Sequence, residues 1–397
     1  QLASSSSEPT ISMHIMLSSM GALETVWVMG ALFGAIGIFP PLLHFVRARR
    51  VTNQLIRPEG EDYLPAITVL LPIRNESKVI ERKISEILAS NYPKSQISLL
   101  IIDSASEDNS VEFAKNLLSN TENSLRNWKV LQIQELGKSV AVNRSLDEIN
   151  TDFFVMMDAD ASSDGESIRK LVCWFQNQDI GAVCGTSSLR NKYDQIYRKK
   201  FNFLRVAESK IDSTPIFEGS ICGFRTSALG GSGIDEKINA DDSQLAMMVR
   251  RNGLRSIMDP DIVFEELNPQ KQPISRKIRR AQGLSRSFWK NRDLLFINSK
   301  GYRAIFRSQF FFHLFFPWLA ISSLLMISAS SIIANYDDAT LSLNIFDLSL
   351  AILIFSPLSR TVREMWFGVL CLVISHSFAL AGIRLNVWDP NRSGIQE

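Results

Sequence analysis

The chain has 397 residues, enough for two or three domains, and its 43 Lys and Arg residues nearly balance its 41 Asp and Glu residues. This balance gives no reason to expect a nucleic acid as partner. The four cysteines and four histidines lack the paired spacing of a zinc site, so zinc is not expected and the thiols are predicted to be free and buried.

Hydrophobic residues are concentrated in long runs towards both ends of the chain. A Ser-rich leader, residues 1–20, precedes an apolar run from Gly21 to Val46, and a helix of about 20 such residues crosses a bilayer. A cleaved signal peptide is the alternative, but it has a basic start and a shorter apolar core. Residues 309–384 contain three more candidate spans, namely Phe310–Ala334, Leu341–Pro357 and Met365–Ile383.

The basic residues predict the orientation of these spans. They follow the first span and precede the second, whereas the loop after the second span, residues 335–338, is acidic. We therefore expect an integral protein of the plasma membrane, with residues between the first two spans in the cytoplasm and both the leader and the tail 385–397 outside. The span 341–357 is short and carries Asn344 and Asp347, so the number of spans is three or four.

Residues 65–270 alternate strand-like and helix-like stretches. Strands are predicted at Ala66–Leu71, Ile97–Ile102, Val130–Gln134 and Phe153–Met157, with helices at Lys78–Ala89, Asn109–Leu118 and Ser139–Glu148. This alternation predicts an α/β domain with a mostly parallel, doubly wound sheet. Ligands of such sheets bind outside the carboxyl ends of the strands.

Acidic residues follow three of the predicted strands. The buried run that ends at Met157 is followed by Asp158 and Asp160, and burying carboxylates is costly without a reason. A divalent cation, Mg²⁺ or Mn²⁺, held by oxygen ligands is one reason, and a strand that ends in two solvated aspartates is the alternative. Glu76 and Asp103 follow two other strands, and their convergence at one sheet edge favours a polar binding site.

A basic segment, residues 271–307, separates this domain from the second span. It contains eleven Lys and Arg residues and one acidic residue, Asp293. Because it directly precedes a predicted span on the cytoplasmic side, anionic lipid headgroups or phosphates fit it better than a nucleic acid. Phe288 and Trp289 within it are typical of an interfacial amphipathic segment.

The motifs of the middle region, in their order, resemble those of membrane-bound family 2 glycosyltransferases. The matching segments are Pro72-Ile73-Arg74-Asn75-Glu76, Asp103-Ser104-Ala105-Ser106-Glu107-Asp108, Gly137-Lys138 with Asn143, Asp158-Ala159-Asp160, Glu218 to Arg225, and Asn239-Ala240-Asp241-Asp242. The resemblance covers about Ile67 to Trp289. It implies a GT-A fold, which is Rossmann-like with a mostly parallel sheet, as a cytoplasmic domain flanked by transmembrane helices.

The resemblance also implies which residues bind a nucleotide-sugar donor, a UDP- or GDP-sugar. They are Pro72, Arg74, Glu76, Asp103, Lys138, Asp158 and Arg279. Asp103 is implied to contact the base and ribose, and Ser104 stands where the family has a second Asp. Lys138 is implied to lie near phosphate, with an ordinary solvated lysine at a helix start as an equal alternative.

Catalytic roles are implied for the carboxylates. Asp158 and Asp160 occupy the family's metal-binding Asp-x-Asp, where Mg²⁺ or Mn²⁺ neutralises the departing diphosphate. Asp242 is implied to be the base that deprotonates the acceptor, and a single base opposite the leaving group implies inversion. Asp241 and Gly219 are implied to lie on the acceptor side. A helix N-cap is the competing role for either aspartate, and a tight turn for Gly219.

The last motif matches only in part. Arg276 and Arg279 align with the family's Gln/Arg-x-x-Arg-Trp, but Arg280 stands at the Trp position, which in polymerising members is associated with the acceptor sugar. We therefore expect an inverting, metal-dependent transfer to a lipid-linked acceptor, a polyprenyl or dolichyl phosphate or a glycolipid. A lipid phosphate is already ionised, so Asp242 would matter less as a base with such an acceptor. A processive polysaccharide synthase and a catalytically inactive membrane scaffold are the alternatives.

Overall fold

A computed structural model of the chain describes residues 8–59, 62–120, 125–188, 195–266, 274–334, 347–349, 351 and 356–385. The chain divides into two compact units. One consists of residues 1–44 and 311–374, and the other of residues 45–310 and 375–397. The second unit contains the predicted α/β domain and is therefore discontinuous in sequence.

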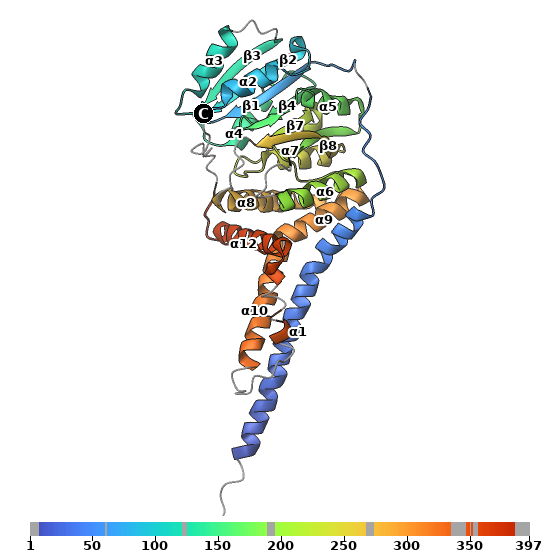
Figure 1. Cartoon of the computed structure of the whole chain (residues 1–397), viewed down its shortest axis with the longest axis vertical. Helices are drawn as coiled ribbons and strands as arrows, with labels where there is room; N and C mark the ends of the chain where they lie inside the picture. The colour runs from blue at the N-terminus through green and yellow to red at the C-terminus, as the bar shows by residue number, and fades with distance from the viewer. Residues whose placement is uncertain are drawn as a thin grey trace, which may run out of the picture. The chain divides into compact units, whose positions relative to one another are not determined.

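The second unit is built on one eight-stranded sheet with the order β3-β2-β1-β4-β7-β6-β8-β5 (Figure 1). The strands are β1 Ile67–Ile73, β2 Ile97–Ser104, β3 Asn127–Ile133, β4 Phe153–Met157, β5 Ala161–Ser163, β6 Ile180–Ser187, β7 Ile221–Arg225 and β8 Arg255–Glu266. The first four pair in parallel, as do β6 and β8, whereas β7 and β5 run antiparallel to their neighbours. The prediction of a mostly parallel α/β sheet is confirmed.

Helices cover both faces of this sheet (Figure 1). From α2 to α9, the helices of the chain are α2 Ile80–Leu88, α3 Ser110–Asn120, α4 Lys138–Leu146, α5 Ser167–Cys173, α6 Gln195–Ile211, α7 Asp241–Arg251, α8 Ile274–Lys290 and α9 Lys300–Leu314. Successive residues of β1 alternate between the two cores: Val69 and Leu71 pack with α2 and α5, and Leu70 packs with α4 and α7. Burial on both faces explains why the parallel strands read as continuous apolar runs.

Pro72 lies inside β1, although β1 is an internal strand. β4 pairs with Ile67–Leu70 only, so the ladder on that side has ended before the proline, which has no N–H to donate. On the other side Pro72 stands opposite Ile102 of β2. The proline therefore marks the point where β1 leaves the sheet for the next loop.

The four cysteines are free and buried, as predicted. The predicted boundaries of the strands and helices differ from the observed ones by a few residues at most, and β4 begins and ends where the sequence predicts. The sequence did not predict the position of β7 in the sheet, between β4 and β6, because the pairing of distant segments leaves no local pattern.

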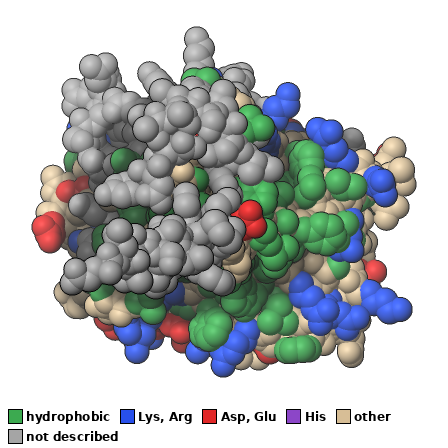
Figure 2. Space-filling view, turned by 90° about the horizontal axis from the view of Figure 1, so that it is seen from below, with side chains coloured by type: hydrophobic (Ala, Val, Ile, Leu, Met, Phe, Trp, Pro, Cys, Tyr) green, Lys and Arg blue, Asp and Glu red, His purple; other side chains and the backbone are tan. Residues whose placement is uncertain are grey.

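The first unit contains α10 Phe316–Ala334 and most of α1 Glu8–Arg49 and α12 Arg360–Leu380. By length and composition, three described stretches could cross a membrane: Gly21–Arg49, Phe316–Ala334 and Val362–Leu380. The predicted span Leu341–Pro357 lies mostly outside the described residues, and the acidic loop 335–338 lies wholly outside them. Large apolar side chains of α1, such as Leu32 and Phe39, are more than half exposed, and Figure 2 shows hydrophobic side chains grouped on one face of the chain.

The predicted start of the second span at Phe310 is wrong. Residues up to Leu314 belong to α9, and a new helix, α10, begins at Phe316. Pro317 explains the break, because it has no N–H to continue the ladder of α9 and is well suited to the first turn of a helix.

Small residues allow α1 and α10 to approach closely within the first unit. A Cβ atom at Gly30 would lie 2.9 Å from Met326 Cβ, and one at Gly34 would lie 2.9 Å from Ser323 Oγ. Neither contact tolerates a side chain larger than hydrogen without a shift of the two helices. This pattern of small residues one turn apart is typical of packed membrane helices.

Candidate active site

The predicted site residues meet at one edge of the sheet because of the strand directions. β1, β2, β3 and β4 are parallel, so the loops that follow them leave from the same edge. β7 runs antiparallel to β4 and pairs Ile221 with Met157. The residues just before β7, Gly219 and Ser220, therefore reach the edge at which β4 ends.

Lys138, the first residue of α4, lies between two carboxylates. Its Nζ is 2.8 Å from Asp158 Oδ1 and 3.3 Å from Asp241 Oδ2. A Cβ atom at Gly219 would lie 3.1 Å from Asp242 Oδ2 and 3.3 Å from Lys138 Nζ. The backbone of Gly219 thus lies against both groups, and a larger residue would crowd them. The structure brings these five residues together.

We call Asp158, Asp160, Asp241 and Asp242 the acidic cluster. Burial raises the pKa of Asp158, and Lys138 lowers it only in part because Asp160 and Asp241 raise it again. Burial and the neighbouring Asp241 raise the pKa of Asp242 from 3.8 to about 7. Asp242 therefore lies in a crowded anionic site in which its ionisation costs free energy.

Lys138 is the cation of this cluster. Burial works to lower its pKa, but the attraction of Asp158, Asp241 and Asp242 outweighs burial and raises the pKa well above its usual value. Its side chain is only 19% exposed. Lys138 is therefore not an ordinary solvated lysine, and its ammonium group stays charged.

The residues of the acidic cluster fit a divalent cation. Three carboxylates, those of Asp158, Asp241 and Asp242, interact with one ammonium group, and the carboxylate oxygens of Asp158 and Asp160 are the hard ligands that Mg²⁺ and Mn²⁺ prefer. In the described part of the chain, no three His, Cys, Asp or Glu side chains are grouped as a metal site. Two protein carboxylates suit an ion that takes its other ligands from a diphosphate and water.

Two loops beside the cluster are joined by hydrogen bonds. Asp103, at the end of β2, accepts hydrogen bonds from the backbone N–H and the hydroxyl of Ser106. Ser106 Oγ accepts from Asn75 N–H at 2.9 Å, and Asn75 Oδ1 accepts from Glu107 N–H at 2.8 Å. Asn75 adopts a φ of 51°, which this residue type tolerates better than most. The loops of the first two motifs thus form one structure.

Asp108 and Ser110 complete that structure. Asp108 accepts from the backbone N–H of Ser77 and of Ser110, and Ser110 Oγ accepts from Glu76 N–H at 2.6 Å. Burial works to raise the pKa of Asp108, but the hydrogen bonds from Ser110 and Ser77 outweigh it and lower the pKa. The sequence motifs implied no role for either residue, although Asp two positions before a helix-starting Ser is a helix-capping pattern.

Ser104, which replaces the family's second Asp, has a structural role here. Its hydroxyl donates to Glu135 O at 2.8 Å and accepts from Gly137 N–H at 3.0 Å. Gly137 has a φ of +135°, a conformation that glycine adopts far more readily than other residues. Ser104 therefore fixes the turn that delivers Lys138, and an aspartate could not donate the bond to Glu135.

Arg82 of α2 forms hydrogen bonds with the loop that contains Asp160. Its guanidinium group donates to Ala159 O at 3.1 Å and to Ala161 O at 3.2 Å, the carbonyl groups on either side of Asp160. Glu86, one turn further along α2, pairs with Arg82 at 3.1 Å. Sequence reasoning missed Arg82, since it lies 77 residues from Ala159 and the motif gives no sign of this contact.

Helix α8 and Leu385 contact the residues that precede α7. A Cβ atom at Gly283 would lie 2.3 Å from Asn239 O, so the backbone of α8 touches the residues that precede α7. Asn239 Nδ2 donates to Leu385 O at 2.8 Å, and Leu385 N–H donates to Gln282 Oε1 at 3.0 Å. Arg279 lies half-buried one turn before Gly283.

The other predicted donor-binding residues lie in β1, in β2 or in the loop after β1. Pro72 is buried within β1, and Arg74 is half-buried in the loop that follows. Glu76 and Asp103 are 3% and 2% exposed. Glu76 N–H donates to Ser110 Oγ, and Asp103 bonds to Ser106, whose hydroxyl accepts from Asn75 N–H, so the loops of Glu76 and Asp103 form one group of predicted site residues.

Sequence comparison identifies the family. The profile of glycosyl transferase family 2 matches residues 68–231, and that of glycosyl transferase family group 2 matches residues 153–379, which is more than half of the chain. The chain belongs to glycosyltransferase family 2. As a family 2 glycosyltransferase it uses a nucleotide-sugar donor, and the resemblance inferred from the motifs is confirmed.

Curated relatives are distant and longer than the matched region. The glycosyltransferase is 24% identical over 273 residues to the poly-beta-1,6-N-acetyl-D-glucosamine synthase of Staphylococcus aureus strain COL, a match that covers 66% of this chain and 62% of the relative. The synthase of the same name from Staphylococcus epidermidis is 23% identical over 172 residues, 43% of this chain and 38% of the relative. The chain thus spans less than two thirds of these relatives.

A solved structure is similar over most of the chain. It is a mannosyltransferase from Pyrobaculum calidifontis in complex with GDP-Man and Mn²⁺, with a TM-score of 0.78 and 25% sequence identity. The likeness covers 89% of this glycosyltransferase and 99% of that chain. The predicted GT-A fold is confirmed.

Proposed function

We propose that this glycosyltransferase transfers one sugar, with inversion, from a nucleotide-sugar donor to a lipid-linked acceptor at the cytoplasmic face of a membrane. The observation that carries the proposal is the position of Lys138 and the acidic cluster, where β4, β7 and α7 meet at the carboxyl edge of the sheet. The two joined loops of Glu76 and Asp103 lie after the neighbouring strands β1 and β2, where a nucleoside would bind.

Asp242 is the base in this proposal. Its pKa of about 7 suits a group that must be ionised to accept a proton yet basic enough to take one. As the acceptor oxygen attacks the anomeric carbon, its proton passes to the Asp242 carboxylate, and the bond from that carbon to the diphosphate breaks with its electron pair on the leaving group. If the acceptor is a lipid phosphate, it is already ionised and Asp242 orients it instead.

Lys138 and the residues of the Asp-x-Asp motif serve the leaving group. The ammonium group of Lys138 stays charged and can pair with a phosphate oxygen. Asp158 and Asp160 would hold Mg²⁺ or Mn²⁺, which would supply positive charge for the diphosphate. The mannosyltransferase of similar fold was solved with GDP-Man and Mn²⁺, so these are the donor and ion to test first.

The proposed lipid acceptor and membrane placement rest on the helices around the domain. Three of the described stretches are long and apolar enough to cross a bilayer. Helix α8, which touches the residues before α7, is basic and carries Trp289 with 57% of its surface exposed. Aromatic and cationic side chains together favour the headgroup region of a membrane. We therefore assign the catalytic domain to the cytoplasmic face of the plasma membrane and the acceptor to a polyprenyl phosphate, a dolichyl phosphate or a glycolipid.

The test follows nucleoside diphosphate release and product formation by the purified full chain. GDP-Man and UDP-GlcNAc are offered with lipid acceptors, with Mn²⁺ or with a chelator. We expect acceptor-dependent release that needs the metal, is lost in Asp158→Asn and Asp242→Asn, and is kept in Asp164→Asn, an exposed carboxylate outside the site. Release that is independent of every lipid acceptor, or that survives in Asp242→Asn with a hydroxyl acceptor, would refute the proposal.

A processive polysaccharide synthase is a second candidate because the curated relatives carry that name. Arg280 at the motif's Trp position argues against it, since its side chain is 56% exposed and lies 3.8 Å from Glu266 rather than offering a sugar-stacking surface. Product length on a gel separates the two. The third alternative, a catalytically inactive scaffold, predicts no binding of GDP-Man or UDP-GlcNAc by calorimetry with Mn²⁺ present.

A further inference from the structure

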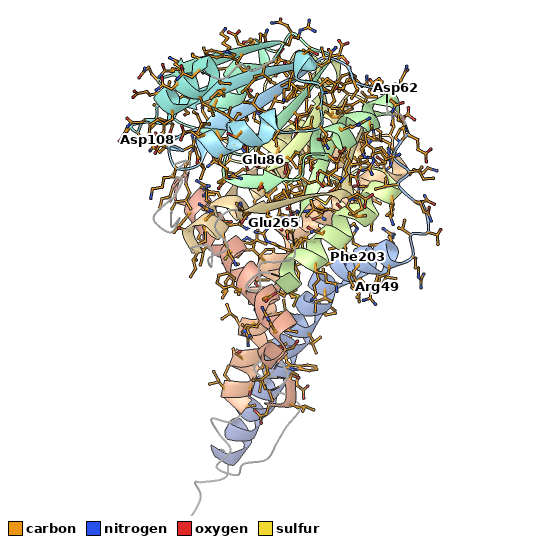
Figure 3. The ribbon with its side chains drawn as sticks, turned by 45° about the horizontal axis from the view of Figure 1, so that its top comes forward. Arg49, Asp62, Glu86, Asp108, Phe203 and Glu265 are labelled. Atoms are coloured by element: carbon orange, nitrogen blue, oxygen red, sulfur yellow. The ribbon has the colours of Figure 1, made fainter. Side chains whose placement is uncertain are left out.

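A pocket of about 460 Å³ lies between the last turn of α1, helix α6 and strand β8. Its apolar wall is formed by Ala48, Phe203, Val206, Ala207 and Val263. Figure 3 shows Arg49, at the end of α1, close to Phe203 of α6. The pocket is large enough for part of an amphiphile, because small-molecule sites are typically about 300–1,000 Å³.

Several polar groups that line this pocket have no ion-pair or hydrogen-bond partner among the described residues. Arg49 and Lys210 both line it, and neither forms an ion pair with any carboxylate of the described residues. Ser187 is 2% exposed, and its buried hydroxyl has no hydrogen-bond partner within the described ranges. Asn202 donates its amide N–H to Ser187 O at 3.1 Å, but its own Oδ1 is likewise buried without a partner. Two cations and an unpaired hydroxyl suit an anionic group.

The position of the pocket on the chain indicates what kind of anion it takes. Residues Gly21–Arg49 form a candidate membrane span, and its last turn, with Ala48 and Arg49, is part of the pocket wall. The polar end of a span lies at the level of the lipid headgroups. At that level an apolar wall beside two cations fits the glycerol, the upper acyl chains and the phosphate of a lipid.

Helix α6 separates the pocket from the reacting groups. Phe203, Val206 and Lys210 line the pocket from one side of the helix. Arg205 lies on the opposite side of α6 and forms an ion pair with Glu218, the residue before Gly219. An occupant of the pocket would therefore touch α6 on the side away from the acidic cluster, so the pocket does not hold the sugar acceptor.

We propose that this pocket binds an anionic phospholipid of the cytoplasmic leaflet as a ligand that is not a substrate. The lipid phosphate pairs with Arg49, Lys210 and the Ser187 hydroxyl, and its chains lie against the apolar wall. By ordering α6 the lipid also orders Arg205 and, through Glu218, the Gly219 segment beside Asp242. The inference rests on the membrane placement proposed above and is independent of which sugar is transferred.

The experiment uses the full chain in a neutral detergent with dioctanoyl phosphatidylglycerol as probe and dioctanoyl phosphatidylcholine in parallel. Binding is followed by native mass spectrometry and by the midpoint of thermal unfolding. The double variant Arg49→Gln with Lys210→Gln removes the cations, and Val263→Trp fills the pocket from a position that is already 41% exposed. Lys129→Gln is the control, because Lys129 is 54% exposed and pairs with Glu148 away from the pocket.

We expect the wild type and the Lys129→Gln variant to bind phosphatidylglycerol at least tenfold more tightly than phosphatidylcholine. Both pocket variants should lose at least tenfold in phosphatidylglycerol affinity and lose the rise in unfolding midpoint. Equal binding of the two lipids, or unchanged binding in both pocket variants, overturns the inference. GDP-Man binding is measured on the same samples, so a failure of the proposed transferase activity is seen separately from a failure of the lipid site.

Discussion

Replacing Asp242 by Asn should abolish transfer and at the same time stabilise the folded chain at alkaline pH. Asn cannot accept a proton, so loss of a general base should lower kcat by about 10²–10⁴-fold. The amide oxygen can still accept the hydrogen bond that Asp242 Oδ1 receives from Ser243 N–H at 2.6 Å. The stabilisation arises because Asn carries no charge in a site that already contains Asp158, Asp160 and Asp241.

The magnitude follows from the raised pKa. Ionising Asp242 in the folded chain, where the pKa is about 7 rather than 3.8, costs about 4 kcal/mol more than in the unfolded chain. Because neighbouring carboxylates share this cost, about 2 kcal/mol is a conservative share for Asp242. Against this gain, Asn loses the attraction of a carboxylate to the first turn of α7, which is about 0.3–1 kcal/mol. The gain is larger, so the net effect is stabilising.

The two pKa values of Asp242, 3.8 in the unfolded chain and about 7 in the folded chain, also determine how its effect on stability changes with pH. A folded chain with the higher pKa binds more protons, so the penalty is absent below 3.8, grows as the pH rises, and is complete above about 7. Thermal unfolding with EDTA present should therefore give Asp242→Asn a higher midpoint than the wild type at pH 8, by about 2–4 °C for each kcal/mol. The difference should disappear near pH 4.

Asp212→Asn serves as a control of opposite sign. Burial works to raise the pKa of Asp212, but its hydrogen bonds with Arg250 and Ser299 lower it, so removing this charge should destabilise the chain at pH 8. If Asp242→Asn has the same midpoint as the wild type at pH 8, or the same advantage at pH 4 and pH 8, the electrostatic account of the acidic cluster is wrong.

Three more predictions address residues around the cluster. Lys138→Met should lower the stability at pH 8 by about 2–4 kcal/mol, since it leaves largely buried carboxylates without their cation, and should weaken GDP-Man binding measured by calorimetry. Gly283→Ala should lower kcat at least tenfold with little change in donor binding, because its Cβ would displace Asn239 and the start of α7. Arg82→Met should weaken Mn²⁺ binding, followed by Mn²⁺ electron paramagnetic resonance, about 10-fold or more, because the Asp160 loop loses its support.

Each of these predictions has an outcome that would contradict it. Unchanged stability of Lys138→Met at pH 8 would mean that the carboxylates are already protonated there. Gly368→Ala is the control for Gly283→Ala, since a Cβ atom at Gly368 has open space, and equal kcat values for the two variants would show that α8 does not position α7. For Arg82→Met, a Mn²⁺ affinity equal to that of the wild type would show that the loop holds its shape without the guanidinium group.

The sequence predicted the half of the sheet that has local signals. β4 was predicted to the residue because five apolar residues end sharply at Asp158, and parallel strands buried on both faces give such runs. The convergence of Glu76, Asp103 and Asp158 at one edge followed from strand direction alone. Their motif order also sufficed to identify the family.

What the sequence could not predict depends on contacts between distant residues. Three such contacts join segments that lie 30 to 80 residues apart. They are the pairing of β7 between β4 and β6, the hydrogen bonds of Arg82 to the Asp160 loop, and the hydrogen bond of Ser104 to the turn at Gly137. None produces a periodic pattern or a turn signal near the residues involved. Tertiary packing alone selects these contacts.

The contact of Asn239 with Leu385 has a consequence for biosynthesis. The residues that support the start of α7 come from both sides of the last two candidate spans, so the catalytic unit is complete only after the final helix has been made. A chain that has been synthesised only as far as α9 lacks Leu385, and it therefore lacks this support for the start of α7.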